Sequence, residues 1–244
     1  MGTTRTGPRR KGSYGLDAPY LLPLPAVALA FNLFQVFLTR NAWPLLGAVV
    51  IAACMASGLY ASRRGKFVVW AKILEGLGLR GDERILDLGC GRGAVLLMAA
   101  RHLTTGRAVG VDLWRGWDQS GNAASATRSN AVLEGVADRV VLQTADMTSL
   151  PFESGVFDLV VSNVAIHNIK GQAGRDKAID EAVRVLRPGG RLVLADIQAT
   201  RRYRERLLAL GQRDVERRSL GWRLWWGGPW MPTYLVTATK PSTR

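Results

Sequence analysis

Three glycines fall within five residues in the stretch DLGCGRG, which runs from Asp87 to Gly93. The stretch directly follows an apolar run typical of a strand and directly precedes a helical pattern. Because glycine has no Cβ, such a loop can turn tightly and let a ligand approach the backbone closely. Gly89, Gly91 and Gly93 are therefore predicted to bind a ligand, although the spacing also fits a loose dinucleotide-binding pattern.

Three acidic residues around this loop narrow the choice of ligand. Asp112 ends the next predicted strand, 19 positions after Gly93, where a carboxylate can accept both hydroxyls of a ribose. Asp87 lies inside the binding turn, where it would repel a pyrophosphate but pair with a ligand that carries an ammonium. Asp146 follows the third predicted strand, where its carboxylate or the neighbouring amide can hydrogen-bond an adenine amino group.

The elements that must position these residues are short β-rich runs that alternate with helical patterns from Arg84 onward. The predicted strands are RILDLG, RAVGVD, VVLQ, FDLVVSN and RLVLADI, and the predicted helices lie near residues 94–102, 122–134 and 172–185. This alternation predicts a doubly wound α/β domain, with a parallel sheet covered by helices on both faces. Two later runs, RSLGWRLWW and TYLVTATK, are expected to pair as an antiparallel hairpin at one sheet edge.

Five motifs in one order, ILDLGCGRG, VGVD, ADMTSLPF, FDLVVSNVAIHNI and VLRPGGRLVLADI, resemble the class I S-adenosylmethionine-dependent methyltransferases. More narrowly, they resemble the branch that includes the quinone and sterol C-methyltransferases. The resemblance covers about residues 67–240. It implies a Rossmann-like sheet of order 3-2-1-4-5-7-6 with an antiparallel seventh strand, and S-adenosyl-L-methionine as cofactor. It also implies the cofactor contacts: the methionine part on Asp87, Gly89, Gly91 and Gly93, the ribose on Asp112, and the adenine on Asp146 and Met147, with Asn163 counted among the cofactor-binding residues.

The segment after FDLVVSN is where a methyl acceptor is expected, because ligands of such sheets bind at the carboxyl ends of the strands. SNVA does not match the D/N-P-P-Y/F motif of methyltransferases that act on nucleic-acid bases, which disfavours a nucleic-acid partner. No carboxylate cluster resembles the metal site of catechol-type O-methyltransferases, so no metal is expected. His167 and Asp196 are the candidate catalytic residues; alternatively, His167 packs beneath the cofactor and Asp196 is a cap.

Two uncharged stretches of 22 residues, 18–39 and 41–62, precede the domain, with Arg40 between them. As helices they would each be about 33 Å long, close to the hydrocarbon thickness of a bilayer. Seven basic residues flank the pair and one lies in the turn, which by the positive-inside tendency puts both ends in the cytoplasm. Residues 18–62 are therefore predicted to form a transmembrane hairpin in the cytoplasmic membrane; a cleaved signal peptide and a buried soluble hairpin are the alternatives.

The remaining segments complete the organisation. Residues 1–17 are expected to be a disordered basic arm, residues 63–80 a linker helix, and residues 81–244 the catalytic domain. A helix from about Arg202 to Leu210 should turn Leu207, Leu208 and Leu210 toward the sheet. The net charge of +14 suggests an anionic partner, and the arginines of residues 201–218 with the aromatic run GWRLWWGGPW fit a membrane surface.

The sequence thus predicts a membrane-anchored S-adenosylmethionine-dependent methyltransferase for a small, lipophilic acceptor. A non-catalytic S-adenosylmethionine-binding membrane scaffold is one alternative. An NAD(P)-dependent oxidoreductase is the other, and it is disfavoured by Asp87 and by the absence of a Tyr-x-x-x-Lys pair near the site.

Overall fold

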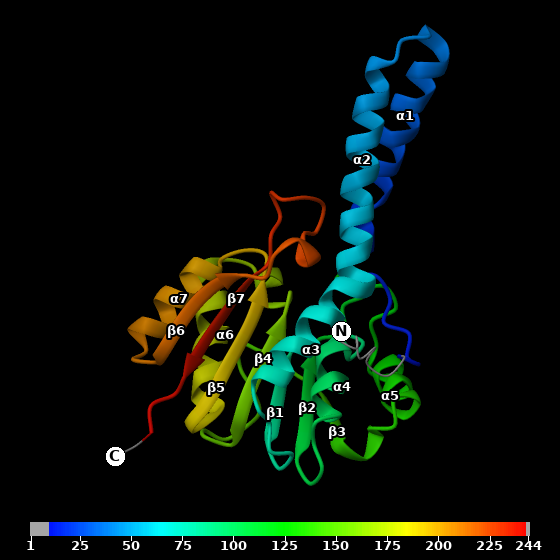
Figure 1. Cartoon of the computed structure of the whole chain (residues 1–244). Helices are drawn as coiled ribbons and strands as arrows, with labels where there is room; N and C mark the ends of the chain where they lie inside the picture. The colour runs from blue at the N-terminus through cyan, green and yellow to red at the C-terminus, as the bar shows by residue number, and fades with distance from the viewer. Residues whose placement is uncertain (1–9, 243–244) are drawn as a thin grey trace, which may run out of the picture.

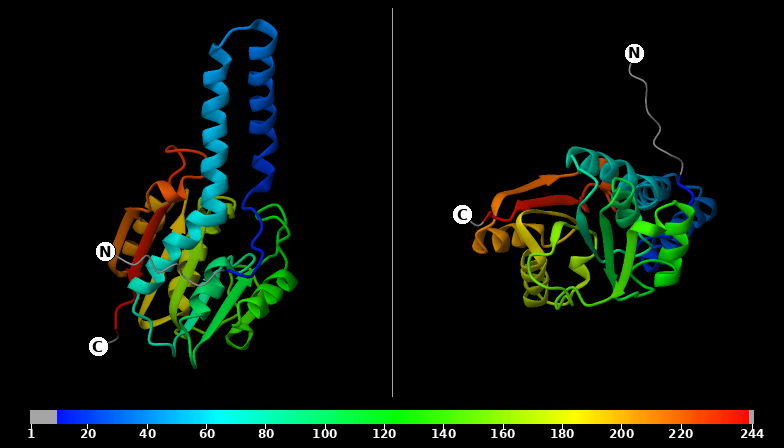
Figure 2. Two further views of the ribbon diagram at one scale, coloured as in Figure 1. Left: turned by 45° about the vertical axis from the view of Figure 1, so that its right-hand side comes forward. Right: turned by 90° about the horizontal axis from the view of Figure 1, so that it is seen from below.

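The computed structural model of the chain describes residues 10–242. A seven-stranded sheet with helices on both faces forms the domain, and a long helical hairpin projects from it (Figure 1). The left-hand view of Figure 2 also shows the hairpin extending well beyond the domain.

The sheet has the expected order β3-β2-β1-β4-β5-β7-β6. Strands β1 to β5 pair in parallel, and β7 is antiparallel to both of its neighbours, as predicted. The strand bounds are β1 Arg84–Leu88, β2 Arg107–Asp112, β3 Val140–Thr144, β4 Phe157–Asn163, β5 Leu186–Asp196, β6 Arg213–Ser219 and β7 Tyr234–Thr239.

Helices cover the sheet in two groups, each with its own apolar core. Helices α3 (Lys66–Gly76), α4 (Ala94–Ala100) and α5 (Ala124–Leu133) pack on one face. Helices α6 (Gln172–Val185) and α7 (Thr200–Ala209) pack on the other. Because side chains alternate along a strand, Ile85 joins the first core and Leu86 the second.

The hairpin consists of α1 (Pro23–Thr39) and α2 (Trp43–Tyr60), with a short 3-10 turn, η1 (Pro19–Leu21), before them. Helix α2 continues through a five-residue π-helical segment, η2 (Ala61–Gly65), into α3, so Trp43–Gly76 is one helix of 34 residues. The expected linker helix is therefore the end of the second hairpin helix. By length and composition only this 34-residue helix among the described residues could cross a membrane; α1, at 17 residues, is shorter.

The N-terminal arm departs from the prediction of disorder over residues 10–17, while residues 1–9 lie outside the described part. Tyr14 is buried, and its hydroxyl donates a 2.8 Å hydrogen bond to Glu134 Oε1. The backbone amides of Lys11 and Gly12 donate to the same oxygen. The arm has no periodic apolar pattern because these polar contacts, rather than an amphipathic face, hold it on the domain.

The C-terminal elements also differ from prediction in two places. Strand β6 is RDVERRS, whereas the tryptophan-rich residues after it form a loop that contains the turn η5 (Trp222–Leu224). Gly221, Gly227 and Gly228 have positive φ in that loop, which interrupts strand pairing. In α7, Leu207 is buried but Leu208 is 46% exposed, since adjacent helical residues point about 100° apart.

The loop after β6 packs on the helix at the root of the hairpin. Ser57 Oγ donates to the Trp225 carbonyl at 2.9 Å, and the rings of Tyr60 and Trp222 stack at 5.3 Å. A Cβ on Gly65 would lie 1.9 Å from the Arg223 carbonyl oxygen. Glycine is therefore required at position 65 for the loop to approach.

Gly65→Ala is expected to lower the free energy of unfolding by about 1–3 kcal/mol, because the loop must move away from the helix. Gly76→Ala is the matched control, since a Cβ there meets nothing within 4 Å. Alanine at that helical position should stabilise the protein by up to about 1 kcal/mol. Denaturant titration of the solubilised proteins compares the two, and equal stabilities would contradict the close packing.

Candidate functional site

A cleft opens at the carboxyl ends of β1, β2 and β4, on the side of the sheet from which the hairpin projects (Figure 1). Its empty space, counted with its open mouth, is about 860 Å³. The predicted cofactor residues that line it are Asp87, Gly89, Gly91, Asp112, Asp146, Met147 and Asn163. Gly93 does not line the cleft; it is the N-cap of α4 and has a φ of 85°.

The glycine loop is shaped by close contacts that exclude any side chain. Gly89 has a φ of 70°, and a Cβ there would lie 2.3 Å from Ala165 Cβ. Gly91 has a φ of 50°, and a Cβ there would lie 2.6 Å from Gln119 Oε1. The loop therefore forms a cradle that a ligand can approach at backbone distance.

Asp112 joins the end of β2 to this cradle. Its Oδ2 accepts a 2.8 Å hydrogen bond from the Gly91 amide, and its Oδ1 accepts a 2.6 Å bond from the Trp114 amide. The Asn122 side-chain amide also donates to Oδ1, at 3.2 Å. A carboxylate has about four acceptor positions, so one is free for a ribose hydroxyl, and a second hydroxyl would take the place of Asn122. This arrangement agrees with the ribose-binding role expected for Asp112.

Asp87 fits the cationic part of the expected cofactor. The side chain is 2% exposed, and its Oδ1 has no hydrogen-bond partner among residues 10–242. Burial raises its pKa to about 8, and the negative charge of Asp112 adds to the rise. A buried carboxylate with one unpartnered oxygen, in the lining of a cleft, is suited to pair with an ammonium from the ligand.

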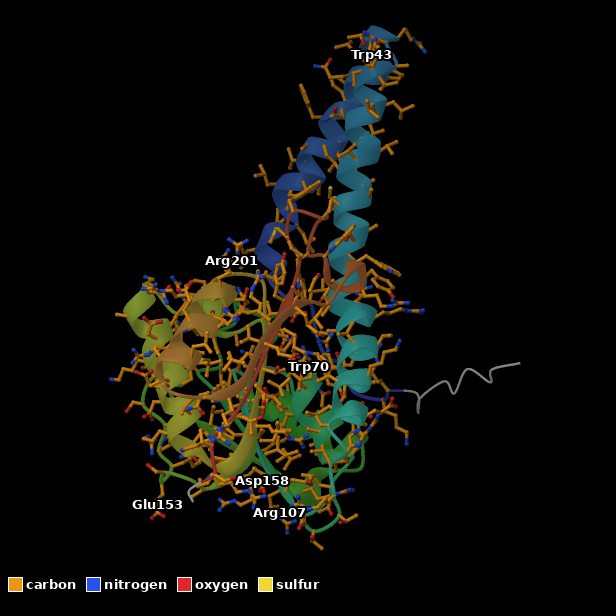
Figure 3. All side chains as sticks on the ribbon, turned by 60° about the vertical axis from the view of Figure 1, so that its left-hand side comes forward. Trp43, Trp70, Arg107, Glu153, Asp158 and Arg201 are labelled. Carbon is orange, nitrogen blue, oxygen red and sulfur yellow. The ribbon has the colours of Figure 1, made fainter. Side chains whose placement is uncertain are left out.

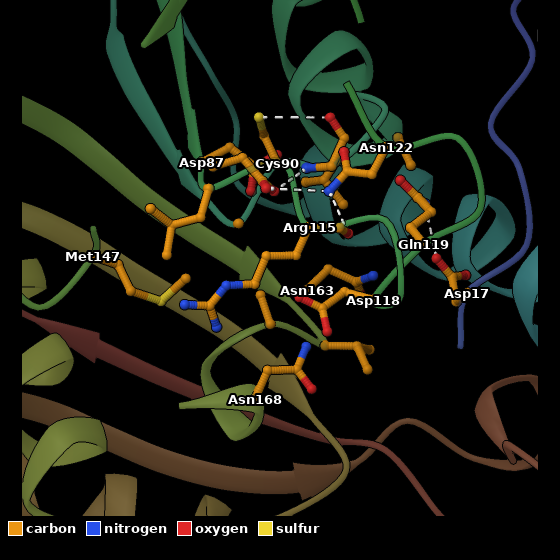
Figure 4. A pocket seen from close by; sticks show the side chains of 18 of the residues that line it. Asp17, Asp87, Cys90, Arg115, Asp118, Gln119, Asn122, Met147, Asn163 and Asn168 are labelled. Carbon is orange, nitrogen blue, oxygen red and sulfur yellow. Dashed lines mark hydrogen bonds between the residues drawn. The ribbon is translucent and has the colours of Figure 1, made fainter. Parts of the chain in front are cut away.

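The turn after β3, where the adenine is expected to bind, lines the cleft. Asp146 Oδ1 accepts from the Thr148 amide at 2.8 Å and from its hydroxyl at 2.9 Å. The Asp146 carboxylate therefore shapes the turn, and Met147 extends into the cleft from it (Figure 4). The polarizable sulfur of a methionine side chain makes favourable contacts with an aromatic ring, such as that of a base.

Asn163 ends β4 at the methionine end of the cleft. Its Oδ1 accepts a 2.8 Å hydrogen bond from Trp70 Nε1, and the Trp70 ring is completely buried. The bond fixes the amide of Asn163 against α3. A cofactor contact from Asn163 must therefore come from its remaining groups.

The two candidate catalytic residues, His167 and Asp196, are paired. His167 Nδ1 lies 2.6 Å from Asp196 Oδ1, and Asp196 Oδ2 accepts from the Tyr203 hydroxyl at 3.2 Å. Neither residue is among those that line the cleft, but Asn168, next to His167, does. A carboxylate at Nδ1 favours the tautomer with a proton there, which leaves Nε2 as the proton acceptor.

Sequence reasoning missed several residues that line the cleft. Asp118 lines the cleft; burial raises its pKa, and the nearby charges of Arg115 and His167 oppose that rise. Asp17 comes from the N-terminal arm and Lys66 from the start of α3. One feature of the sequence could have drawn attention to Asp17, because it is the single acidic residue before Glu75 in a strongly basic segment.

One of the two cysteines, Cys90, lines the cleft. Cys90 lies in the glycine loop, where burial raises the pKa of its thiol well above the usual range, and Cys54 lies in α2. Within residues 10–242 no three His, Cys, Asp or Glu side chains are grouped as metal ligands would be.

Comparison with known proteins agrees with this geometry. Residues 86–194 match the family described as the methyltransferase domain. The chain is 33% identical over 131 residues to the sterol 4-C-methyltransferase strm-1 of Caenorhabditis elegans. The aligned segment is 54% of this chain and 36% of that protein. It is also 33% identical over 116 residues to the demethylmenaquinone methyltransferase of Lactiplantibacillus plantarum. That aligned segment is 47% of this chain and 45% of the other protein. The chain thus spans less than half the length of these relatives.

A solved structure with the same fold is the [4+2]-cyclase SpnF. It superposes with a TM-score of 0.58 at 20% identity, over 71% of this chain and 81% of that one. This likeness concerns the fold alone. The family match and the relatives confirm the predicted enzyme class and cofactor, and the cradle of glycines and the unpartnered oxygen of Asp87 agree with them. The chain therefore carries a match to the methyltransferase domain over residues 86–194, with a cleft that fits S-adenosylmethionine as cofactor.

Proposed function

We propose that this protein is a membrane-anchored methyltransferase that transfers the methyl group of S-adenosylmethionine to a small lipophilic acceptor at the cytoplasmic surface of a membrane. The observation that carries the proposal is the position of the cleft, whose lining includes Asp17 and Lys66 at the root of the hairpin. Figure 1 shows the hairpin projecting from that end of the domain. The relatives named for sterol and demethylmenaquinone methylation support an acceptor of this chemical class.

The hairpin presents apolar side chains to its surroundings along its length (Figure 3). Among the residues described in α1 none is buried, and in α2 only Ala48 is. Phe31, Phe37 and Leu38 are 57%, 69% and 64% exposed. Soluble monomers rarely expose a contiguous apolar surface of this size, so a lipid environment is the natural partner of the hairpin.

The root of the hairpin has the composition of a membrane interface. Tyr20, Trp222 and Trp230 are each more than half exposed, and amphipathic rings favour the headgroup layer. Arg201 lies on the same side of the domain as the hairpin, whereas Arg107 and Asp158 lie at the far end (Figure 3). Cationic side chains near an anionic leaflet gain roughly 1 kcal/mol each.

The start of α1 and the end of α2 both lie at the domain. This agrees with the two ends of the hairpin being in one compartment. The amide of Ala18 donates to the Asp118 carbonyl at 3.0 Å, so α1 starts beside the cleft, and α2 returns directly into α3. With basic residues flanking both helices, the positive-inside tendency favours the cytoplasm for the domain.

At the acceptor end, the residues of this chain would position the acceptor and accept its proton. The cofactor supplies an electrophilic methyl group. With the cofactor bound as the methyl donor, His167 Nε2 would accept the proton of a hydroxyl or acidic carbon acceptor. Asp196 stabilises the resulting imidazolium, because its carboxylate lies 2.6 Å from Nδ1.

His167→Ala is expected to lower kcat by about 100-fold or more, the usual contribution of a general base, while the Kd for S-adenosylmethionine changes less than about twofold. His102→Ala is the control, because His102 is exposed in the turn after α4. An unchanged kcat in His167→Ala would assign the pair a packing role only.

Membrane anchorage is tested by reconstituting the full chain in lipid vesicles and washing them with alkaline carbonate. The wild type is expected to stay with the vesicles. A variant with Phe31→Asp, Phe34→Asp and Val49→Asp, all exposed positions of the hairpin, should be released. Release of the wild type would overturn the membrane part of the proposal and leave the methyltransferase domain unaffected.

A further inference from the structure

Lys66 is a buried cation at the wall of the cofactor cleft. It is 1% exposed, and it lies at the first position of α3, in the same continuous helix as the second hairpin helix. Its Nζ lies 2.6 Å from Asp17 Oδ2. Burial of a lysine is costly even when the ammonium is paired, so its presence at a ligand cleft calls for a function.

A polar network fixes this lysine relative to the glycine loop. Asp17 Oδ2 also accepts from Ser62 Oγ at 2.8 Å, and Asp17 Oδ1 accepts from Gln119 Nε2 at 2.8 Å. Gln119 Oε1 in turn accepts from the Arg92 amide at 2.7 Å. The network connects the N-terminal arm, the hairpin helix and the cofactor cradle, and Asp17 and Gln119 are drawn together in Figure 4.

The charges of the cleft leave few partners for a ligand carboxylate. Its acidic lining residues are Asp17, Asp87, Asp112, Asp118 and Asp146, and its basic ones are Lys66 and Arg115. S-adenosylmethionine carries an ammonium, a sulfonium and one carboxylate. The acids suit the two cationic groups, but the carboxylate needs a cation among so many acids.

Position distinguishes the two cations. The side chain of Arg115 extends toward Met147, at the adenine end of the cleft (Figure 4). Lys66 lies one helical turn before Trp70, and these positions share a helix face. Trp70 Nε1 binds Asn163 at the end of β4, the strand beside β1 and its Asp87. Lys66 is therefore the cation at the methionine end.

We propose that Lys66 binds the carboxylate of the methionine part of S-adenosylmethionine, and that Asp17 is a positioning residue that holds Lys66 toward the cleft. A lysine ammonium has three donors, and within residues 10–242 one bond to Asp17 is formed. The helix that continues the hairpin thus supplies part of the cofactor site. This inference depends on cofactor binding and is independent of membrane insertion.

Calorimetric titration of the detergent-solubilised full chain tests the assignment with two probes. S-adenosylmethionine has the carboxylate, and decarboxylated S-adenosylmethionine lacks it. Lys66→Met is expected to weaken binding of S-adenosylmethionine by about 10- to 100-fold, as for loss of a charge-assisted contact, and binding of the decarboxylated probe by less than about threefold. Lys72→Met, on the exposed side of the same helix, should bind both probes like the wild type.

Two further variants separate a direct contact from a structural role. Lys66→Arg keeps the charge and should retain most of the preference for S-adenosylmethionine over the decarboxylated probe. Asp17→Asn keeps the lysine but loosens it, so it should reduce that preference in part. If Lys66→Met weakened the binding of both probes equally, or left the preference for S-adenosylmethionine over the decarboxylated probe unchanged, the assignment would be overturned. Failure of the wild type to bind S-adenosylmethionine would instead contradict the cofactor itself.

Discussion

Asp112→Ala is expected to weaken the binding of S-adenosylmethionine by about 100-fold or more. The change removes a charged acceptor for two ribose hydroxyls, and hydrogen bonds to charged groups contribute roughly 1.5–3 kcal/mol each. It also releases the amides of Gly91 and Trp114, which Asp112 holds at 2.8 and 2.6 Å. The cradle and the ribose contact are therefore lost together.

The measurement is a parallel titration with S-adenosylmethionine, its demethylated product and NADH. Wild-type protein should bind the first two and not NADH, and Asp112→Ala should bind none measurably. Asp82→Ala is a matched control, because Asp82 is exposed and pairs with the exposed Arg80. Cofactor affinity within threefold of the wild type in Asp112→Ala would refute the ribose assignment.

The affinity for S-adenosylmethionine should rise about tenfold between pH 6 and pH 7, because the ammonium of the ligand pairs with ionised Asp87. Burial raises the pKa of Asp87 to about 8, so the free protein holds the carboxyl protonated below that pH. Binding must release this proton, and the ionised fraction of a group with that pKa grows about tenfold per pH unit here. Asp87→Asn should weaken binding and abolish the rise.

Titrations at both pH values, in buffers of different ionisation enthalpy, measure the affinity and the proton released. A flat profile in the wild type, or the same slope in Asp87→Asn, would contradict the role of Asp87. Stability provides an independent readout. Because the folded pKa lies above the unfolded value, the folded state binds more protons between about pH 4 and pH 8, and stability falls as pH rises through that window. Asp87→Asn should remove this fall.

The cofactor cradle was predictable because its signals are local, whereas the sheet order followed from the resemblance of the five motifs to a known family. A strand, a glycine turn and an acidic residue at the end of the next strand are read directly from spacing, and the chain places Asp87, Gly89 and Asp112 as expected. The motif order then implied the antiparallel β7, which the structure confirms.

The contacts between distant segments were not predictable in the same way. Asp17 reaches Lys66 across 49 residues and Gln119 across 102, and no local pattern records such pairing. His167 and Asp196 were each proposed separately, and only the fold brings them within 2.6 Å. The tryptophan-rich run has strong strand propensity, but its glycines and its packing on the hairpin root override that preference.

The most direct test of the central claim is methyl transfer itself. The reconstituted full chain would be incubated with S-adenosylmethionine labelled in its methyl group, once with a membrane lipid extract and once with a water-soluble metabolite extract. We expect label in an organic-soluble product from the lipid extract, and none when Asp112→Ala replaces the wild type. Label found only in water-soluble products, or no labelled product from either extract by a protein that binds the cofactor, would contradict a methyltransferase for a lipophilic acceptor.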